Sequence, residues 1–176
     1  MKIDRIKSKV TGKQLPTPNS ITCGFDNASS LRCVFYDLEN GETATFFTAG
    51  TVHEGHTGIM HGGLSAAVLD EVMGRATIHR MTSRAEEWLP QYVTAEMTCK
   101  YLKPIRTGQK MFAYGRVDRI EGRCCFNSAE IVDENGEVMS TATGVYVRVD
   151  QLKDKLPAEE YMRQVSMLTD NDPREL

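Results

Sequence analysis

A stretch of ten residues, 61–70, brings together three groups that could act on an anion or a polarised carbonyl. His61 is followed directly by Gly62 and Gly63, and Asp70 comes seven residues after the second glycine. If a helix begins at the glycine pair, its first backbone N–H groups are unpaired and carry partial positive charge, and the glycines leave them open to approach. The stretch therefore predicts an anion or oxyanion site, with a histidine at its edge and a carboxylate about two and a half turns further on.

A helix to carry Asp70 is predicted from the residues that follow the glycines. Residues 64–80 contain no proline. At 100° per residue, their apolar side chains gather on one half of the helix, which should be buried. These side chains are Leu64, Val68, Leu69, Val72, Met73 and Ala76.

On the opposite half of this helix, Asp70 has small neighbours that would let a second surface or a ligand come close. They are Ala66, Gly74 and Thr77. Glu71 and Arg75, at positions i and i+4, are expected to form an ordinary helix ion pair. From spacing alone, a tight turn, a capping histidine and a solvated helix acid stand as the alternative to a functional site.

The other regular elements are expected to be strands. Runs rich in strand-forming residues span 31–38, 43–48, 92–101, 111–120, 124–132 and 138–149. Asn-Gly or Glu-Gly pairs separate three neighbouring pairs of runs, as in hairpins. Within 92–101, strict alternation places Thr94 on the polar face, opposite Met97 and Cys99. One long helix that buries its apolar half against such an antiparallel sheet is a two-layer α+β domain.

The motif and the element order resemble a known family. His61-Gly62-Gly63 followed by Asp70 is similar to the H-G-G-x6-D signature of the hotdog-fold acyl-CoA thioesterases of the phenylacetyl-CoA (PaaI) type. The segment 93–104 resembles that family's strand after the helix, with its Tyr-x-x-Pro ending. The resemblance covers residues 30–149 and implies a hotdog fold, in which an antiparallel sheet wraps around one long helix.

The resemblance also implies a division of labour in the hydrolysis of an acyl-CoA. Asp70 would be the general base or nucleophile, the Gly62 N–H would lead the oxyanion contact with Gly63 beside it, and His61 would position the carbonyl. Thr94 matches a hydroxyl that orients the acid or the water in some relatives. The active site would lie between two subunits of a homodimer or homotetramer, and the scheme needs no cofactor.

The chain departs from the family's pattern at residue 55, where several relatives carry an asparagine that helps to hold the water or the thioester. Here the residue is Gly55, and His56 or Thr57 is expected to take over as a substrate contact. This departure keeps a second class open, a non-catalytic hotdog module that binds acyl-CoA. A hotdog hydratase or dehydratase is a further alternative, although those signatures place histidine and acid differently.

Three histidines, His53, His56 and His61, fall within nine residues and raise the question of a metal site. Their spacing lacks the H-E-x-x-H pattern of a zinc-binding helix, and Gly55 and Gly58 disfavour a helix there. We therefore expect no metal. A metal-dependent hydrolase remains an alternative that a chelator would identify.

Composition limits the classes of protein that fit. Of the 176 residues, 40% are hydrophobic and 26% are charged, which is typical of a globular domain. The net charge of −3 gives no electrostatic basis for binding nucleic acid. No apolar run approaches the length of a membrane span, and the N-terminus has no apolar export segment. We expect a cytoplasmic protein without a membrane or nucleic-acid partner.

The sequence predicts one domain with two extensions. Residues 1–22 are polar and rich in lysine, and we expect an N-terminal arm there. Residues 23–150 should form the hotdog thioesterase domain. The charged residues 151–176 are expected to be a C-terminal appendage.

Overall fold

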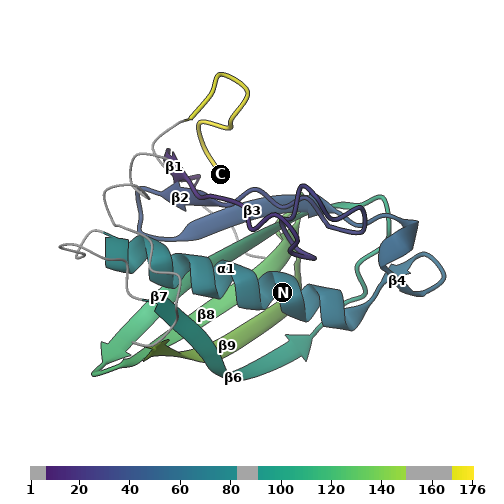
Figure 1. Cartoon of the computed structure of the whole chain (residues 1–176). Coiled ribbons are helices and arrows are strands. Elements are labelled where there is room, and N and C mark those ends of the chain that lie inside the picture. The colour runs from purple at the N-terminus through teal and green to yellow at the C-terminus, as the bar shows by residue number, and fades with distance from the viewer. Residues whose placement is uncertain (1–6, 83–90, 150–167) are drawn as a thin grey trace.

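A computed structural model describes residues 7–82, 91–149 and 168–176 of the chain. One long helix, α1 (Gly62–Thr82), lies along one face of a seven-stranded antiparallel sheet (Figure 1). The strand order is β1-β2-β3-β7-β8-β9-β6, and a separate hairpin, β4–β5, leads into the helix. The predicted two-layer α+β arrangement is therefore confirmed.

A short 3-10 helix, η1 (Thr51–His53), precedes β4. The bounds of the nine strands in the described residues are as follows. They are β1 (Val10–Lys13), β2 (Tyr36–Leu38), β3 (Thr43–Thr48), β4 (Glu54–His56), β5 (Ile59–Met60), β6 (Gln91–Tyr101), β7 (Lys110–Glu121), β8 (Cys124–Asp133) and β9 (Val138–Val149). The three expected hairpin turns contain Gly41, Gly122 and Gly136 at φ of 85°, 57° and 75°, a backbone conformation that favours glycine.

The apolar half of α1 forms the centre of the main core. Five of its predicted residues are completely buried against the sheet: Val68, Leu69, Val72, Met73 and Ala76. Only Leu64, in the first turn, stays partly exposed. Burying each of the four larger side chains contributes about 1.5–3 kcal/mol, so the stripe fixes which side of α1 faces away from the sheet.

The ion pair of α1 differs from the ordinary surface pair that the spacing predicts. Arg75 Nε donates to Glu71 Oε1 at 2.9 Å, but Arg75 itself is only 6% exposed. Its guanidinium also donates to the carbonyl of Leu15 and lies 5.1 Å from the centre of the Phe35 ring. Arg75 therefore binds the segment between β1 and β2 and holds it against the helix.

Two differences from the sequence expectations concern the segments before the helix. The strand expected over 31–38 begins only at Tyr36. Arg32 has a φ of 57°, outside the extended region, and the N–H groups of Leu31 and Cys33 are donated to carbonyls of residues 21 and 22 and not to a sheet strand. Within the predicted arm, residues 10–13 form β1 and pair with β2.

Of the C-terminal appendage expected over 151–176, residues 151–167 lie outside the described residues.

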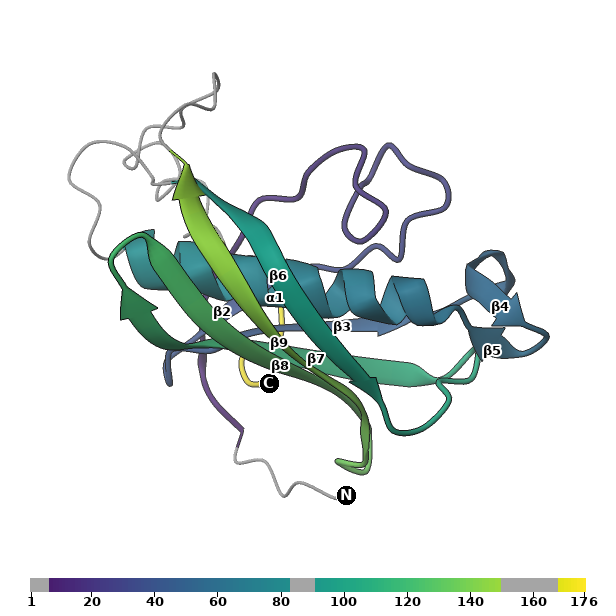
Figure 2. The ribbon, with the colours of Figure 1, turned by 90° about the horizontal axis from the view of Figure 1, so that it is seen from below.

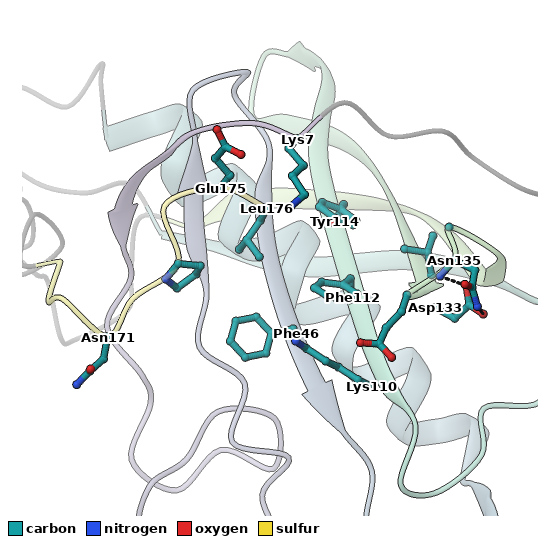
Figure 3. A pocket seen from close by; sticks show the side chains of 14 residues that line it. Lys7, Phe46, Lys110, Phe112, Tyr114, Asp133, Asn135, Asn171, Glu175 and Leu176 are labelled. Carbon is teal, nitrogen blue, oxygen red and sulfur yellow. Dashed lines mark hydrogen bonds between the residues drawn. The ribbon is translucent and has the colours of Figure 1, made fainter.

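The face of the sheet opposite α1 carries a second apolar cluster. Tyr36, Leu38 and Tyr114 are among its buried members, and Phe46 and Phe112 pack against them. Residues 168–176 extend over this outer face, where Leu176 and Ser8 exchange two backbone hydrogen bonds. A cavity of about 630 Å³ remains between this segment and the two phenylalanines (Figure 3).

No helix in the described part of the chain combines the length and the apolar character that a membrane crossing requires.

Candidate active site

The N-terminus of α1 leaves one backbone donor available. His61 Nδ1 accepts the N–H of Gly63 at 2.9 Å, and the carbonyl of His61 accepts the N–H groups of Leu64 and Ser65 at 2.9 and 3.3 Å. No acceptor for the Gly62 N–H lies within the described residues. Four N–H groups at a helix start have no i→i−4 partner, here those of residues 61–64, and three of them are used, because the N–H of His61 is donated to the carbonyl of His53 at 2.8 Å. Gly62 therefore offers the free donor, whereas the N–H of Gly63, predicted to lie beside it as a ligand contact, is already donated to His61.

This cap also sets the tautomer of His61. Because Nδ1 accepts a hydrogen bond, the proton of the neutral ring is carried by Nε2. The imidazole is exposed and follows β5 directly. His61 thus carries an exposed N–H donor at the start of α1, where Gly62 also has its free N–H.

The structure gives a physical reason for the glycine at position 55. A Cβ atom built on Gly55 would lie 3.0 Å from both Cα and Cδ2 of His61. The space that a larger residue would need is therefore occupied by His61. His56 and Thr57 are exposed at the end of the β4–β5 hairpin, and none of their side-chain contacts joins them to Asp70.

Asp70 is half-buried, and two hydroxyl groups converge on one of its carboxylate oxygens. Thr94 Oγ1 donates to Asp70 Oδ1 at 2.8 Å. The hydroxyl of Tyr146 lies 2.8 Å from the same oxygen and 2.8 Å from the main-chain carbonyl of Asp70. Thr94 in β6 and Tyr146 in β9 are direct cross-strand partners, so the two strands supply the pair of donors together.

Thr94 reaches Asp70 because β6 contains a bulge. Thr94 pairs with Tyr146 and Glu96 pairs with Val145, so Ala95 is the extra residue. A bulge shifts the alternation of side chains by one position. Thr94 therefore faces the helix, as do Met97 and Cys99 beyond the bulge. The strict alternation predicted from sequence, with Thr94 on the opposite face, is wrong at this point.

Tyr146 is the residue of this cluster that sequence reasoning missed. It is 2% exposed. Burial raises the pKa of Tyr146 far above its usual range, and the neighbouring charge of Asp70 raises it further. Glycines make room for the ring, because a Cβ at Gly74 would lie 3.5 Å, and one at Gly144 3.1 Å, from its carbons. The sequence does contain a pattern that could have pointed to Tyr146: it follows Gly144 by two residues, on the same face of the strand.

The acid and the free helix donor are well separated within one subunit. Gly62 and Asp70 are both in α1, and a rise of about 1.5 Å per residue places them about 12 Å apart along its axis. β6 contacts α1 and crosses it obliquely in Figure 2, and its Thr94 reaches Asp70. Its last residue, Tyr101, would lie 3.5 Å from a Cβ at Gly62. A single reacting carbonyl cannot contact both groups of the same chain.

No group of three or more His, Cys, Asp or Glu side chains in residues 7–82, 91–149 and 168–176 is arranged to hold a metal ion. Both ring nitrogens of His53 are already used: Nδ1 accepts the N–H of Gly50 at 2.8 Å, and Nε2 lies 3.0 Å from the carbonyl of Ser29. His53 is therefore a buried structural residue.

The known proteins that this chain resembles are thioesterases. The profile described as "Thioesterase superfamily" matches residues 57–140. The acyl-coenzyme A thioesterase THEM4 of Xenopus laevis is 27% identical over 118 residues, which cover 66% of this chain and 50% of that protein. THEM4 of Bos taurus is 25% identical over 147 residues, covering 82% and 57% of the two chains. The chain thus spans about half the length of the curated relatives that it matches.

Solved structures agree on the fold. The PaaI protein of the E. coli phenylacetic acid degradation operon superposes with a TM-score of 0.60 at 17% identity, covering 69% of this chain and 83% of that one. A hypothetical thioesterase of Streptococcus pneumoniae, solved with coenzyme A, superposes with a TM-score of 0.56 at 18% identity, covering 63% and 83%. The hotdog fold expected from the sequence is therefore confirmed.

Proposed function

Residues 57–140 belong to the thioesterase superfamily, and from this premise we propose that the chain is an acyl-CoA thioesterase. It hydrolyses an acyl-CoA to free CoA and a carboxylic acid. Two observations outside the chain support the substrate class: its curated relatives are named acyl-coenzyme A thioesterases, and a structural neighbour was solved with coenzyme A. Within the chain, the observation that carries the proposal is a half-buried carboxylate with one oxygen held by two hydroxyls.

Asp70 acts through Oδ2, by one of two routes. As a general base, it takes a proton from water, and the hydroxide adds to the thioester carbonyl carbon. The C–S bond then breaks, and the departing CoA thiolate takes the proton back. As a nucleophile, Asp70 adds to the carbonyl carbon and expels CoA thiolate, and water hydrolyses the mixed anhydride. Both routes need Asp70 ionised at the start.

The negative charge that develops on the carbonyl oxygen is stabilised by the free N–H at the start of α1. An oxyanion donor of this kind contributes about 3–4 kcal/mol to the transition state. Gly62 supplies the N–H, and the Nε2–H of His61 lies next to it as a second donor that positions the carbonyl. His56 and Thr57, on the exposed hairpin end, stay candidates for contacts to the substrate.

The site is completed by a second copy of the chain. Because Asp70 and Gly62 of one chain are about 12 Å apart, Asp70 works with Gly62 of the partner subunit. The surface that supports this pairing is β6, which ends the sheet and presents backbone groups for pairing. Its exposed apolar side chains include Val93 and Tyr101, at 42% and 56% exposure. We propose a homodimer, or a homotetramer built from it, and a cytoplasmic location.

The second candidate is a hotdog module that binds acyl-CoA without hydrolysing it. The glycine at position 55 favours this candidate, because the family resemblance implies a side chain there that holds the water or the thioester, and this chain lacks it. The carboxylate of Asp70, with Oδ1 held by two hydroxyls and Oδ2 open, favours the thioesterase over the binding module.

The test measures the release of free CoA thiol from short, long and aromatic acyl-CoAs by the wild type and by Asp70→Asn. The proposal predicts turnover by the wild type that disappears in the variant, and the panel then ranks the acyl groups. Tight binding of acyl-CoA by the wild type without turnover would establish the binding module. Turnover that chelator abolishes and zinc restores would show a metal-dependent hydrolase instead.

A further inference from the structure

The two hydroxyl donors at Asp70 meet the same oxygen. Thr94 Oγ1 and the Tyr146 hydroxyl each lie 2.8 Å from Oδ1. No donor to Oδ2 is found in the described ranges of the chain. The carboxylate is therefore asymmetric, with one oxygen saturated by the protein and the other left open.

The single proton of Tyr146 has two acceptors within reach, Oδ1 and the main-chain carbonyl of Asp70. That carbonyl is inside α1 and already accepts the N–H of Gly74. A charged carboxylate oxygen is also the stronger acceptor. The proton of Tyr146 is therefore donated to Oδ1.

The ring of Tyr146 cannot easily move away from this position. It is almost completely buried, and it lies against the helix at Gly74 and against its own strand at Gly144. Thr94, on the more exposed strand β6, has less support from its surroundings.

We propose that Tyr146 is a positioning residue for the thioesterase reaction. Its hydroxyl holds Oδ1 of Asp70, prevents the carboxylate from rotating, and so directs Oδ2 toward the water or the thioester. This inference rests on the proposed function and adds to it a residue and the identity of the reacting oxygen.

The titratable groups around this carboxylate make a pH profile informative. The hydroxyl of Tyr146 in β9 contacts it, its charge acts on the thiol of Cys99 in β6, and the charge of Glu71 in α1 acts on Tyr146. The pKa values of both Tyr146 and Cys99 are raised, chiefly by burial and then by the charge of Asp70. Both groups therefore stay protonated at neutral pH, and neither produces an acidic limb of the kcat profile.

The test compares Tyr146→Phe with the wild type, using kcat, KM and the pH dependence of kcat for acyl-CoA hydrolysis. We expect kcat to fall about 10- to 100-fold with KM nearly unchanged, because the ring still packs while the carboxylate loses its fixed orientation. The acidic limb should move to higher pH by about half a unit to one unit, because a carboxylate that has lost a donor is protonated more easily. A fold defect would lower the rate without moving this limb.

Tyr36→Phe is the matched control. The hydroxyl of Tyr36 also donates to a carboxylate, Asp172 Oδ1 at 3.0 Å, but on the outer face of the sheet. This variant should lower the thermal stability and leave kcat and the acidic limb unchanged. If Tyr146→Phe does not fold, 3-fluorotyrosine at position 146 replaces it. The more acidic phenol donates more strongly and should move the limb to lower pH.

The possible outcomes separate this inference from the function it rests on. Wild-type turnover that Asp70→Asn abolishes, together with an unchanged kcat and acidic limb in Tyr146→Phe, would overturn the role of Tyr146 alone. An unchanged limb with 3-fluorotyrosine would do the same. Absence of turnover in the wild type would overturn the proposed function and this inference with it.

Discussion

Two aspartates on opposite faces of the sheet each accept a hydrogen bond from a tyrosine hydroxyl, and their surroundings differ completely. On the outer face, Asp172 accepts from Tyr36, from Lys13 Nζ at 2.9 and 3.2 Å, and from the N–H and hydroxyl of Thr169 at 2.7 and 2.9 Å. On the helix face, Asp70 accepts from two hydroxyls at one oxygen. No cation is paired with Asp70 among the residues that the structure describes.

The difference separates a carboxylate that holds the fold together from one that can react. Burial would raise the pKa of Asp172, but the hydrogen bonds from Thr169 and the neighbouring Lys13 and Tyr36 outweigh it and hold this pKa well below its usual range. Both of its oxygens are occupied. Asp70 keeps one oxygen open and is only half-buried, so substrate or water can reach it, as a base or nucleophile requires.

Substituting Asp70 by asparagine should abolish activity and spare stability, whereas the same substitution at Asp172 should do the opposite. We expect Asp70→Asn to lower kcat for acyl-CoA hydrolysis by about 10²–10⁴-fold, the range for loss of a general acid–base group. Its thermal unfolding should stay close to that of the wild type, because asparagine keeps the acceptor for Thr94 and Tyr146. CoA release and thermal unfolding measure the two effects. Wild-type rates in this variant would refute the catalytic role of Asp70.

The free donor at the helix start can be removed without changing the helix. Gly62→Pro deletes the N–H, and proline is well tolerated at the first helical position. We expect kcat to fall about 10²–10³-fold, the effect of losing one oxyanion donor. Gly62→Ala is the matched control, because it keeps the N–H and its Cβ would meet Tyr101 at an ordinary 3.5 Å. Equal losses in both variants would show that space, not the N–H, matters at Gly62.

A side chain at position 55 should harm the site rather than restore it. Both Gly55→Asn and Gly55→Ala place a Cβ 3.0 Å from His61. Displacing this histidine by a few tenths of an ångström should lower kcat about tenfold in either variant. Steady-state kinetics of the two variants provide the check. A gain in activity with asparagine but not with alanine would contradict this prediction and would show that an amide side chain at position 55 assists the reaction.

The smallest effect on activity is expected at Asp172. Asp172→Asn should lower the free energy of unfolding by about 1–3 kcal/mol, as expected for loss of a buried charged hydrogen-bond acceptor, and should leave kcat unchanged. Because the pKa of Asp172 is lowered in the folded protein, its stabilising contribution is present at neutral pH. That contribution begins to be lost as the pH falls below about 4, the pKa of an unfolded aspartate, and is fully lost only once the pH has fallen through the lowered pKa of the folded protein. Denaturant unfolding at several pH values should therefore show the wild type and variant converging in acid.

Much of the fold was predictable because its signals are local. The apolar stripe from Val68 to Ala76 has the helical period, and the Asn-Gly pairs at Gly41 and Gly136 mark hairpin turns. The association of His61 and Gly62 with a helix start follows from glycine and capping chemistry within a few residues. These features depend on neighbours in the sequence, and the structure bears them out.

The rest depends on contacts between distant segments. The bulge at Ala95 changes the face of Thr94, but only the register with β9 reveals it. Tyr146 is 76 residues from Asp70 in sequence, so no spacing rule connects them. Arg75 has the spacing of a surface ion pair, and its burial follows from the segment before β2 that folds over it. Long-range packing decides each of these cases.

The most direct test of the account mixes two inactive variants, Asp70→Asn and Gly62→Pro, by co-expression. If one site uses Asp70 of one chain and Gly62 of the other, each mixed dimer carries one intact site. Random assembly should then restore about a quarter of the wild-type rate. Purified dimers of either variant alone should stay inactive. If the mixed preparation is no more active than the separate variants, Asp70 and Gly62 do not meet across a subunit interface, and the proposed site is wrong.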